Sequence, residues 1–410
     1  MKLKDAYKVK KTFEKFGLHP SLKRVLEWFD SGDIVRKNLL SLENLKYDKI
    51  NNIIGNSVLY DLNLLKSEHY LEDLKIICSA PSGTIASYLR CIATDVLSLN
   101  SKYHHKDMLC ICYCDDEDKV EYLYELAINR YSLYSESNHI YDMNLISSAK
   151  SLNIAGYLVA LGSSKESLKS EFHRENMELI AKAKTDDIAF YIKEASLSYF
   201  NIENSNYEKN IRLISNAKTD KIAMYLSELV CSGDFDDSPY YKHDLNLIAA
   251  AKTDVIAECL KVLALSTESI NSGYHTEDMN LIANAKTDEI AKYLLQVASD
   301  GDSLTSLYHS DDMELIANAK TDQIAMILAN LATSEKSLNS GKHMKEMKLI
   351  AESKYDDVAI CYGLLSCSED EECYNEYINY VDSTVKNTEV VKNRKKTRNV
   401  TKKHQNYLHN

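Results

Sequence analysis

The sequence has little proline and glycine, one tryptophan, and no long apolar run. Its 410 residues include 3 Pro and 11 Gly, which leaves few residues that interrupt helices. This scarcity favours an all-helical chain and argues against a turn-rich β fold. No run of about 18 apolar residues is present to span a bilayer, and the N-terminal residues lack the apolar centre of a signal peptide. The 10 cysteines are scattered rather than spaced as a disulfide framework, so we expect a cytoplasmic protein without membrane contact.

One eight-residue string recurs along the chain at a fixed pitch. It reads LIANAKTD at residues 281–288 and again, letter for letter, at residues 315–322. Weaker copies begin at Ile76 and Cys110, and the step after Cys110 is one position longer than the others. A period of about 34 residues is the signature of stacked supersecondary units, so we predict about nine repeats. Close variants of the string start at this constant interval, at Leu145, Leu179, Leu213, Leu247 and Leu349.

Each repeat is expected to contain two helices. In the repeat that begins near Tyr274, helix A covers about residues 276–285, and Thr287 offers a hydroxyl that caps helix B. Helix B runs to about Ser299 with one broad apolar face, and a connector of about ten residues leads to the next helix A. Ala291 lies on that face, where a small side chain lets neighbouring helices approach closely. A large residue at this position is therefore expected to overpack the stack.

The repeat length and the helix pair resemble the tetratricopeptide class of solenoid. Ala291 and Ala298 stand seven residues apart, as two small positions do in that family. The Trp, Leu-Gly and terminal Pro positions of the family have no counterpart here, so no ligand-binding residues transfer. The resemblance implies an architecture of helix pairs in a right-handed superhelix with a concave groove. We therefore predict an all-α, right-handed α-solenoid of about nine two-helix repeats with atypical helical caps.

The predicted array is bounded by segments that fit the repeat poorly. Residues 1–67 are expected to form an N-terminal helical cap with a degenerate unit around residues 39–54, followed by the array at residues 68–373. Residues 374–386 are expected to form a closing helix, because an interior unit at a terminus would expose its stacking face. Residues 387–410 are polar and basic without periodicity, which predicts a disordered tail.

Histidine and cysteine recur in patterns that suggest metal ligands. Equivalent residues in stacked helices lie ~8–10 Å apart, too far for two histidines to share a zinc ion. Tyr207 and Tyr241 replace the histidine in two repeats, which favours packing and hydrogen bonding over metal binding. Cys110, Cys112 and Cys114 cannot face one ion from a single helix, so we expect them in the core and predict no metal and no cofactor. The histidine stands just before helix A, at His104, His139, His173, His275, His309 and His343.

Charged residues also follow the repeat. A lysine such as Lys286 ends helix A and an aspartate such as Asp288 begins helix B. A lysine ladder could bind a phosphate backbone or an acidic peptide, but both positions match the helix dipoles, which favours a structural role. His275 and Asp278 have the spacing of an acid–base pair, yet a pattern repeated along a scaffold belongs to its folding code. Because the sequence has no Gly-rich phosphate loop or nucleophile motif, we predict that the chain is not an enzyme.

Positions that vary between repeats are free of the stacking code and indicate where a ligand is bound. One B-helix position holds Phe190, Met224 and Met326, which we expect to be exposed on consecutive B helices as an apolar stripe. The alternative is that these three residues pack beneath the connectors. Two A-helix positions that vary in the same way hold Arg212 and Lys182. We predict that a protein or peptide partner binds along the repeat face through these five residues.

Positive charge gathers at one end of the chain. The whole chain carries a net charge of −12 and residues 392–404 carry +7, so the remainder carries −19. An acidic body is a poor surface for nucleic acid or an anionic membrane. The alternative function is therefore nucleic-acid or ribonucleoprotein binding by the tail together with the basic N-terminal helix. The basic residues of the tail are Lys392, Arg394, Lys395, Lys396, Arg398, Lys402 and Lys403.

Overall fold

The structure, a computed structural model, describes residues 2–16, 18–44, 62–202, 204–232 and 238–353, together with residues 356, 359 and 363. Across these ranges all regular secondary structure is helical and no strand occurs, which confirms the predicted all-α solenoid. The chain divides into two compact units, Met1–Cys231 and Ser232–Asn410. The predicted closing helix, the basic tail and most of the degenerate unit lie outside the described residues.

Before residue 45, the first unit begins with three described helices. They are α1 (Lys2–Lys15), α2 (Leu22–Asp30) and α3 (Asp33–Ser41), with a 3₁₀ turn at Leu42–Asn44. Phe13 and Trp28 pack between α1 and α2 with ring centroids 5.7 Å apart. Gly32 is the N-cap residue of α3 and has a φ of +146°, a backbone conformation that residues other than glycine rarely adopt. These helices and the short α4 (Leu62–Leu65) lie where the sequence predicted an atypical cap.

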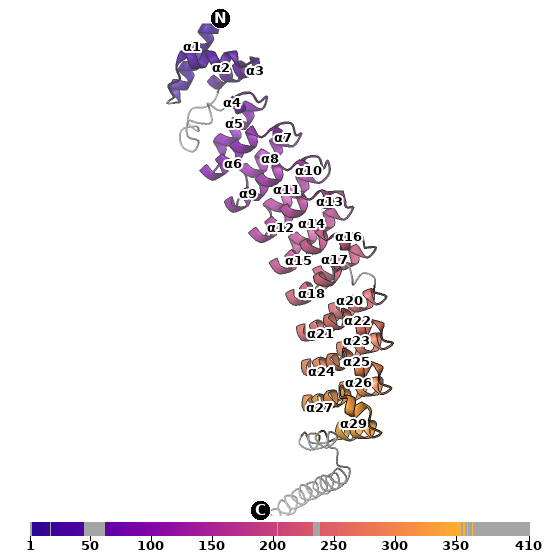
Figure 1. The fold of residues 1–410 in the computed structure, drawn as a ribbon. Helices are drawn as coiled ribbons and strands as arrows, with labels where there is room; N and C mark the ends of the chain where they lie inside the picture. The colour runs from indigo at the N-terminus through magenta and orange to yellow at the C-terminus, as the bar shows by residue number, and fades with distance from the viewer. Residues whose placement is uncertain are drawn as a thin grey trace, which may run out of the picture. The chain divides into compact units, whose positions relative to one another are not determined.

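The A helices form one row in each unit (Figure 1). Met279 and Ile282 are fully buried against the B helices, whereas Leu281 and Ala283 are half-buried on opposite flanks of the helix. Cys110, at the position of Leu281, points its Sγ toward the carbonyl oxygen of Met143 on the next A helix, 4.0 Å away. The repeated leucine thus packs between neighbouring A helices. Within the described residues, the A helices are α5 (Tyr70–Ser79), α8 (His104–Cys112), α11 (His139–Ser147), α14 (His173–Lys182) and α17 (Tyr207–Ser215) in the first unit, and α20 (Tyr241–Ala250), α23 (His275–Ala283), α26 (His309–Ala317) and α29 (His343–Glu352) in the second.

The B helices form a second row beside the A helices. Thr287 caps α24, as predicted, because its Oγ1 accepts a hydrogen bond from the backbone N–H of Ile290 at 3.1 Å. Ala291 and Leu294 are fully buried in the stack. The described B helices are α6 (Gly83–Thr94), α9 (Val120–Ala127, after a 3₁₀ turn at Glu117–Lys119), α12 (Leu152–Gly162), α15 (Asp186–Leu197) and α18 (Asp220–Val230) in the first unit, and α21 (Asp254–Ala264), α24 (Asp288–Ala298) and α27 (Asp322–Ala332) in the second.

In the connectors after α6, α9, α12, α15, α21, α24 and α27, the structure contains a short third helix that the sequence did not predict. In the connector after α24, the side chain of Asp300 caps this helix by accepting the backbone N–H of Ser303 at 2.9 Å. The hydroxyl of Ser303 points inward and is fully buried. The short helices lie along the side of the A row away from the B helices (Figure 1). They are α7 (Val96–Leu99), α10 (Arg130–Leu133), α13 (Lys165–Lys169) and α16 (Tyr199–Ile202) in the first unit, and α22 (Thr267–Asn271), α25 (Gly301–Thr305) and α28 (Glu335–Leu338) in the second.

The charged residues of the motif connect neighbouring repeats. The hydroxyl of Thr287 donates to the carboxylate of Asp322 in the next repeat at 2.6 Å, while it also caps its own helix. Lys286 donates to the carbonyl oxygen of Ala319, beyond the end of the next A helix, at 3.4 Å. Each lysine that makes this bond therefore donates to a carbonyl oxygen at the C-terminal end of the neighbouring A helix. It also lies near the C-terminal end of the A helix in its own repeat. The same lysine bond occurs from Lys184 to the carbonyl oxygen of Ala217 and from Lys320 to that of Ser353.

Candidate functional site

The histidine at the start of helix A belongs to a buried hydrogen-bonded network that spans two repeats. Its Nε2 lies 2.8–3.3 Å from a carboxylate oxygen on the preceding A helix. Its Nδ1 lies 2.7–3.0 Å from the hydroxyl of a serine on the preceding short helix. None of these side chains is more than 3% exposed. The sets are Ser98–His104–Asp73, Ser132–His139–Asp107 and Ser167–His173–Asp142 in the first unit, and Ser269–His275–Asp244, Ser303–His309–Asp278 and Ser337–His343–Asp312 in the second.

The structure corrects the pairing that the sequence suggested. His275 and Asp278 of one repeat do not face each other as a pair. His275 instead contacts Asp244 of the repeat before it, and Asp278 contacts His309 of the repeat after it. The network therefore fixes one repeat against the next. The serine had a signal in the sequence, because it recurs six or seven residues before each histidine, but no helix was predicted in the connector.

The chemistry of the network differs from that of a serine hydrolase. In a hydrolase triad the serine hydroxyl bonds Nε2 of the histidine and the aspartate bonds Nδ1. Here the serine hydroxyl bonds Nδ1 and the aspartate bonds Nε2. Ser303, His309 and Asp278 are also buried. Burial raises the pKa of the Asp278 carboxyl, and the hydrogen bond from His309 opposes that shift. Burial raises the pKa of Asp107 and Asp312 in the same way.

The network around Tyr207 consists of neutral partners instead. Tyr207 stands where histidine is expected, and the residue opposite it on the preceding A helix is Asn176 instead of aspartate. Asn201 takes the place of the serine on α16, and its Oδ1 accepts a hydrogen bond from Asn210 at 2.8 Å. Where tyrosine replaces the histidine, asparagine thus also replaces the aspartate. The pairing follows from charge, because a buried carboxylate needs a cationic or strongly donating partner that tyrosine only partly supplies.

The three cysteines near the end of α8, Cys110, Cys112 and Cys114, lie in different surroundings. The Sγ of Cys112 lies 3.6 Å from the carbonyl oxygen of Ile76, whereas that of Cys110 lies toward Met143 on the opposite side. Cys112 and Cys114 are buried and Cys110 is half-buried. Burial raises the pKa of the Cys110 thiol to about 11. Among the residues described, no three His, Cys, Asp or Glu side chains gather in a way that could hold a metal ion.

The five residues predicted to bind a partner lie on helices of both units. Phe190 and Met224 lie on the neighbouring helices α15 and α18, but Met326 lies on α27 in the second unit. All three are half-buried rather than exposed, and Phe190 packs against Tyr157 with ring centroids 5.7 Å apart. The expected stripe on consecutive B helices is also interrupted in the sequence, because Glu258 and Lys292 occupy this position in the two repeats between Met224 and Met326.

The two predicted cationic residues lie on exposed faces of A helices and are ion-paired. Arg212 contacts Glu175 at 2.9 Å and Glu208 at 2.7 Å. Lys182 contacts Glu178 one helical turn away at 2.6 Å. The basic residues of the predicted tail lie outside the described residues.

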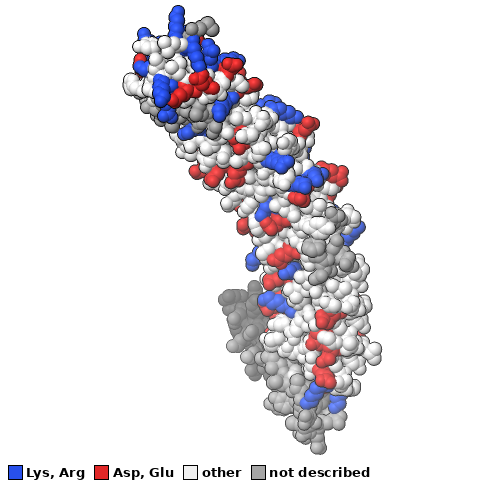
Figure 2. All heavy atoms as spheres, turned by 45° about the horizontal axis from the view of Figure 1, so that its top comes forward, with Lys and Arg blue, Asp and Glu red and all other residues white. Residues whose placement is uncertain are grey.

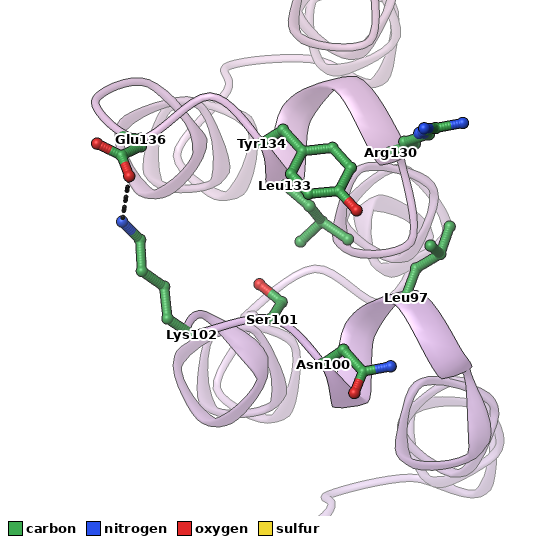
Figure 3. A pocket seen from close by; sticks show the side chains of 8 residues that line it. All are labelled: Leu97, Asn100, Ser101, Lys102, Arg130, Leu133, Tyr134 and Glu136. Atoms are coloured by element: carbon green, nitrogen blue, oxygen red, sulfur yellow. Dashed lines mark ion pairs between the residues drawn. The ribbon is translucent and has the colours of Figure 1, made fainter.

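A surface recess that the sequence did not predict lies between the short helices α7 and α10 (Figure 3). Its volume is about 340 Å³. Leu97, Leu133 and Tyr134 supply its apolar lining, and the ion pair between Lys102 and Glu136, 3.6 Å apart, crosses its rim. A second recess of about 450 Å³ lies at the same place in the repeat between α25 and α28 of the second unit. The recess is therefore a recurring product of how consecutive short helices pack.

The fold is that of an all-α solenoid, in which the repeats that the structure describes completely contain two long helices and a short one. No described helix is long and apolar enough to cross a membrane. Comparison of the sequence with family models and with curated protein sequences finds no match.

Proposed function

We propose that this protein is a non-catalytic scaffold that binds a protein or peptide partner on the ridge of short helices. The observation that carries the proposal is the recurring recess between consecutive short helices. Its apolar side chains are displayed to solvent: Leu97 is 42% exposed, Tyr134 is 71% exposed, and Leu307 at the second recess is 96% exposed. Clustered exposed apolar side chains on a soluble fold are typical of interaction surfaces. A recess of this size accommodates one or two side chains of a partner.

The buried networks support a scaffold in preference to an enzyme. A catalytic site needs its reactive groups within reach of a substrate, whereas Ser303 and His309 have no exposed surface. The same set of residues also occurs six times in the described part of the chain, and an active site is normally built once. These polar groups form hydrogen bonds between neighbouring repeats. The surface residues that vary between repeats then remain to bind a partner. The location in a reducing, cytoplasmic compartment stays a proposal, which the buried free thiols of Cys78 and Cys112 support.

The test is site-specific photo-crosslinking at the recess. A photoreactive amino acid replaces Tyr134, and a control variant carries it in place of Tyr113. The two tyrosines are matched, because they are 71% and 73% exposed, but Tyr113 lies at the end of α8 outside the recess. We expect a discrete protein crosslinked from position 134 and absent from position 113. Equal crosslinking from both positions, or none from either, would contradict binding at the recess.

The alternative function, nucleic-acid binding, has one observation in its favour. Residues 2–44 contain ten lysine and arginine residues against six acids, and Figure 2 shows positive side chains gathered over these N-terminal helices. Several of these lysines are engaged in ion pairs, such as Lys8 with Glu43 at 2.5 Å. Salt titration separates the two functions, because phosphate binding weakens steeply between about 50 and 200 mM salt. Nucleic-acid affinity that survives deletion of residues 387–410 would rule out the tail as its source.

A further inference from the structure

A row of tyrosines follows the B helices of the first unit. Tyrosine occupies one equivalent position on α6, α9, α12, α15 and α18, at Tyr88, Tyr122, Tyr157, Tyr191 and Tyr225. The first four are half-buried and keep part of the ring at the surface, whereas Tyr225 is 7% exposed. This position lies beside that of Phe190 and Met224, so aromatic and apolar side chains occupy adjacent positions along the face. We call this surface the tyrosine strip.

The rings of the tyrosine strip reach from each repeat to the next. Tyr88 lies 5.3 Å from the ring of Tyr124 on the following B helix, and Tyr157 lies 5.7 Å from that of Phe190. Between these pairs, the ring of Tyr122 covers Gly156, where an added Cβ would lie 3.5 Å from it. The aromatic surface thus runs along several repeats in succession.

The tyrosine strip is bordered by negative charge. Helices α9, α12, α15 and α18 carry seven aspartates and glutamates against two lysines. Among the acids, Asp187, Glu194 and Glu228 are exposed. Burial and the nearby carboxylates together raise the pKa of Tyr157 and Tyr191, so the negative potential reaches the ring hydroxyls. A surface of this sign attracts cations and repels acidic partners.

One of the two lysines shows how a cation fits this surface. The Nζ of Lys193 lies 4.4 Å from the ring centroid of Phe190 and 5.6 Å from that of Tyr157. The same Nζ pairs with the carboxylate of Glu194. An ammonium group between two ring faces and a carboxylate is the arrangement in which proteins recognise lysine and arginine side chains. The chain therefore displays this recognition within its own surface.

We propose that the tyrosine strip binds a lysine- or arginine-rich segment of a protein partner. The inference rests on the proposed function as a scaffold and names the chemistry of one partner, at a surface distinct from the recess. Stacked helices are spaced ~8–10 Å apart, and an extended peptide advances ~3.3 Å per residue. A basic side chain at every third residue then meets one B helix per repeat. The segment lies across the B helices with its cations over the rings and between the carboxylates.

The experiment measures the affinity of the full chain for a fluorescent twelve-residue peptide that carries lysine at every third position and glutamine and alanine between. Fluorescence anisotropy is recorded at about 150 mM salt, where exposed long-range charge effects are screened beyond ~8 Å. A control peptide has glutamine in place of each lysine and is expected not to bind. Far-UV circular dichroism confirms that every variant is folded.

Two substitutions separate ring recognition from general charge attraction. Phe190→Leu keeps an apolar side chain and the net charge but removes a ring face, and we expect binding about 2–5-fold weaker, as a cation–π contribution of ~0.5–1 kcal/mol implies. Lys193→Gln removes the cation that occupies the rings, and we expect tighter binding. Asp187→Asn with Glu194→Gln weakens binding, whereas the matched pair Asp311→Asn with Glu314→Gln, on α26 of the second unit, leaves it unchanged.

Three results would overturn the inference. The first is an unchanged affinity in both Phe190→Leu and Lys193→Gln. The second is equal weakening by the acid-to-amide pairs on α15 and α26, which would show attraction to overall charge alone. The third is the absence of peptide binding. If Tyr134 nevertheless crosslinks to a protein partner, the inference fails and the proposed function stands; if neither surface engages a partner, both fail.

Discussion

Replacing His309 by tyrosine tests whether the buried network holds neighbouring repeats together by charge and hydrogen bonding. His309 Nε2 contacts the Asp278 carboxylate at 3.1 Å, and its Nδ1 contacts the Ser303 hydroxyl at 3.0 Å. Tyrosine at this position leaves a buried carboxylate with one hydroxyl donor. Removing one partner of a buried ion pair costs ~3–5 kcal/mol, and the tyrosine hydrogen bond offsets ~1 kcal/mol of it. We therefore expect His309→Tyr to lower the free energy of unfolding by ~2–4 kcal/mol at neutral pH.

The second substitution, Asp278→Asn, is expected to rescue part of this loss. The double variant reproduces the neutral pair that the chain itself uses at Asn176 and Tyr207. Its remaining cost is ~1–2 kcal/mol, mainly because the hydroxyl of Ser303 loses its partner. The double-mutant cycle should then show a coupling energy of at least ~1 kcal/mol, as is typical of residues in one network.

The loss in His309→Tyr should also depend on pH. Burial raises the folded-state pKa of Asp278, and the hydrogen bond from His309 lowers it, so removing His309 raises it further. A carboxyl with a raised pKa in the folded state binds its proton more tightly there than in the unfolded chain. The free energy of unfolding therefore falls as the pH rises from ~3.9, the pKa of aspartate in the unfolded chain, through the higher pKa of the folded state. The single variant is then closest to the wild type near pH 4, and Asp278→Asn removes this dependence.

Native-state hydrogen exchange is the appropriate assay, because repeat arrays do not unfold in one step and each repeat contacts only its neighbours. We expect faster exchange in α23 and α26 for His309→Tyr, with α8 and α11 of the first unit unchanged. Additive losses in the double variant, or a loss that is the same at pH 4 and pH 7, would refute the charge argument.

Three further substitutions or reactions test the stacking of the repeats. Ala291→Leu should overpack the fully buried side of α24 and cost ~1–3 kcal/mol, seen as a lower urea midpoint; an unchanged midpoint would mean that the B helices leave space there. Thr287→Val should remove the cap of α24 and the bond to Asp322 for ~1–2 kcal/mol, with faster exchange in the first turn of α24 but not of α21. Cys110, whose pKa is raised to about 11, should be alkylated at pH 8 much more slowly than exposed Cys91, and faster as pH approaches 11; equal rates in residue-level mass spectrometry would contradict the burial.

The long helices of the repeat could be predicted from the sequence because the same apolar and capping residues recur in every copy. Thr287 and Asp288 mark the start of α24, and the buried residues Met279 and Ile282 stand three positions apart, as residues on one face of a helix do. The short helices could not be predicted in this way, since four or five residues give too little periodicity to distinguish a helix from a turn. What remained visible was a serine six or seven residues before each histidine.

The partners in the buried network could not be assigned from spacing alone. Four of the six histidines are followed three residues later by an aspartate of their own helix, and all six are preceded by an aspartate of the previous A helix, so most repeats fit both pairings. The repeats in which tyrosine replaces the histidine show which aspartate is its partner. The two tyrosines that replace the histidine are each preceded, at the aspartate position of the previous A helix, by an asparagine: Asn176 before Tyr207 and Asn210 before Tyr241. The aspartate position of one A helix is therefore charged where the next A helix begins with histidine and neutral where it begins with tyrosine.

The surface sites could be predicted least. Whether Phe190 or Tyr134 is exposed depends on how each helix is rotated against its neighbours, and periodicity constrains that rotation only for the buried face. Phe190 was expected to be exposed but packs against Tyr157, and the recess at Tyr134 depends on a short helix that was not expected. The row of tyrosines on the B helices was visible as a repeated letter, but its contacts with the next repeat were not.

The most direct test of the scaffold function is affinity capture from a native lysate at moderate salt, with and without nuclease. The wild-type chain is compared with the double variant Leu97→Gln/Tyr134→Gln, which removes the apolar lining of the recess without changing charge. Our account predicts a discrete protein that the wild type retains after nuclease treatment and that the variant loses. Retention that disappears with nuclease, or that is the same for the variant, would contradict it and would direct attention to the basic ends of the chain.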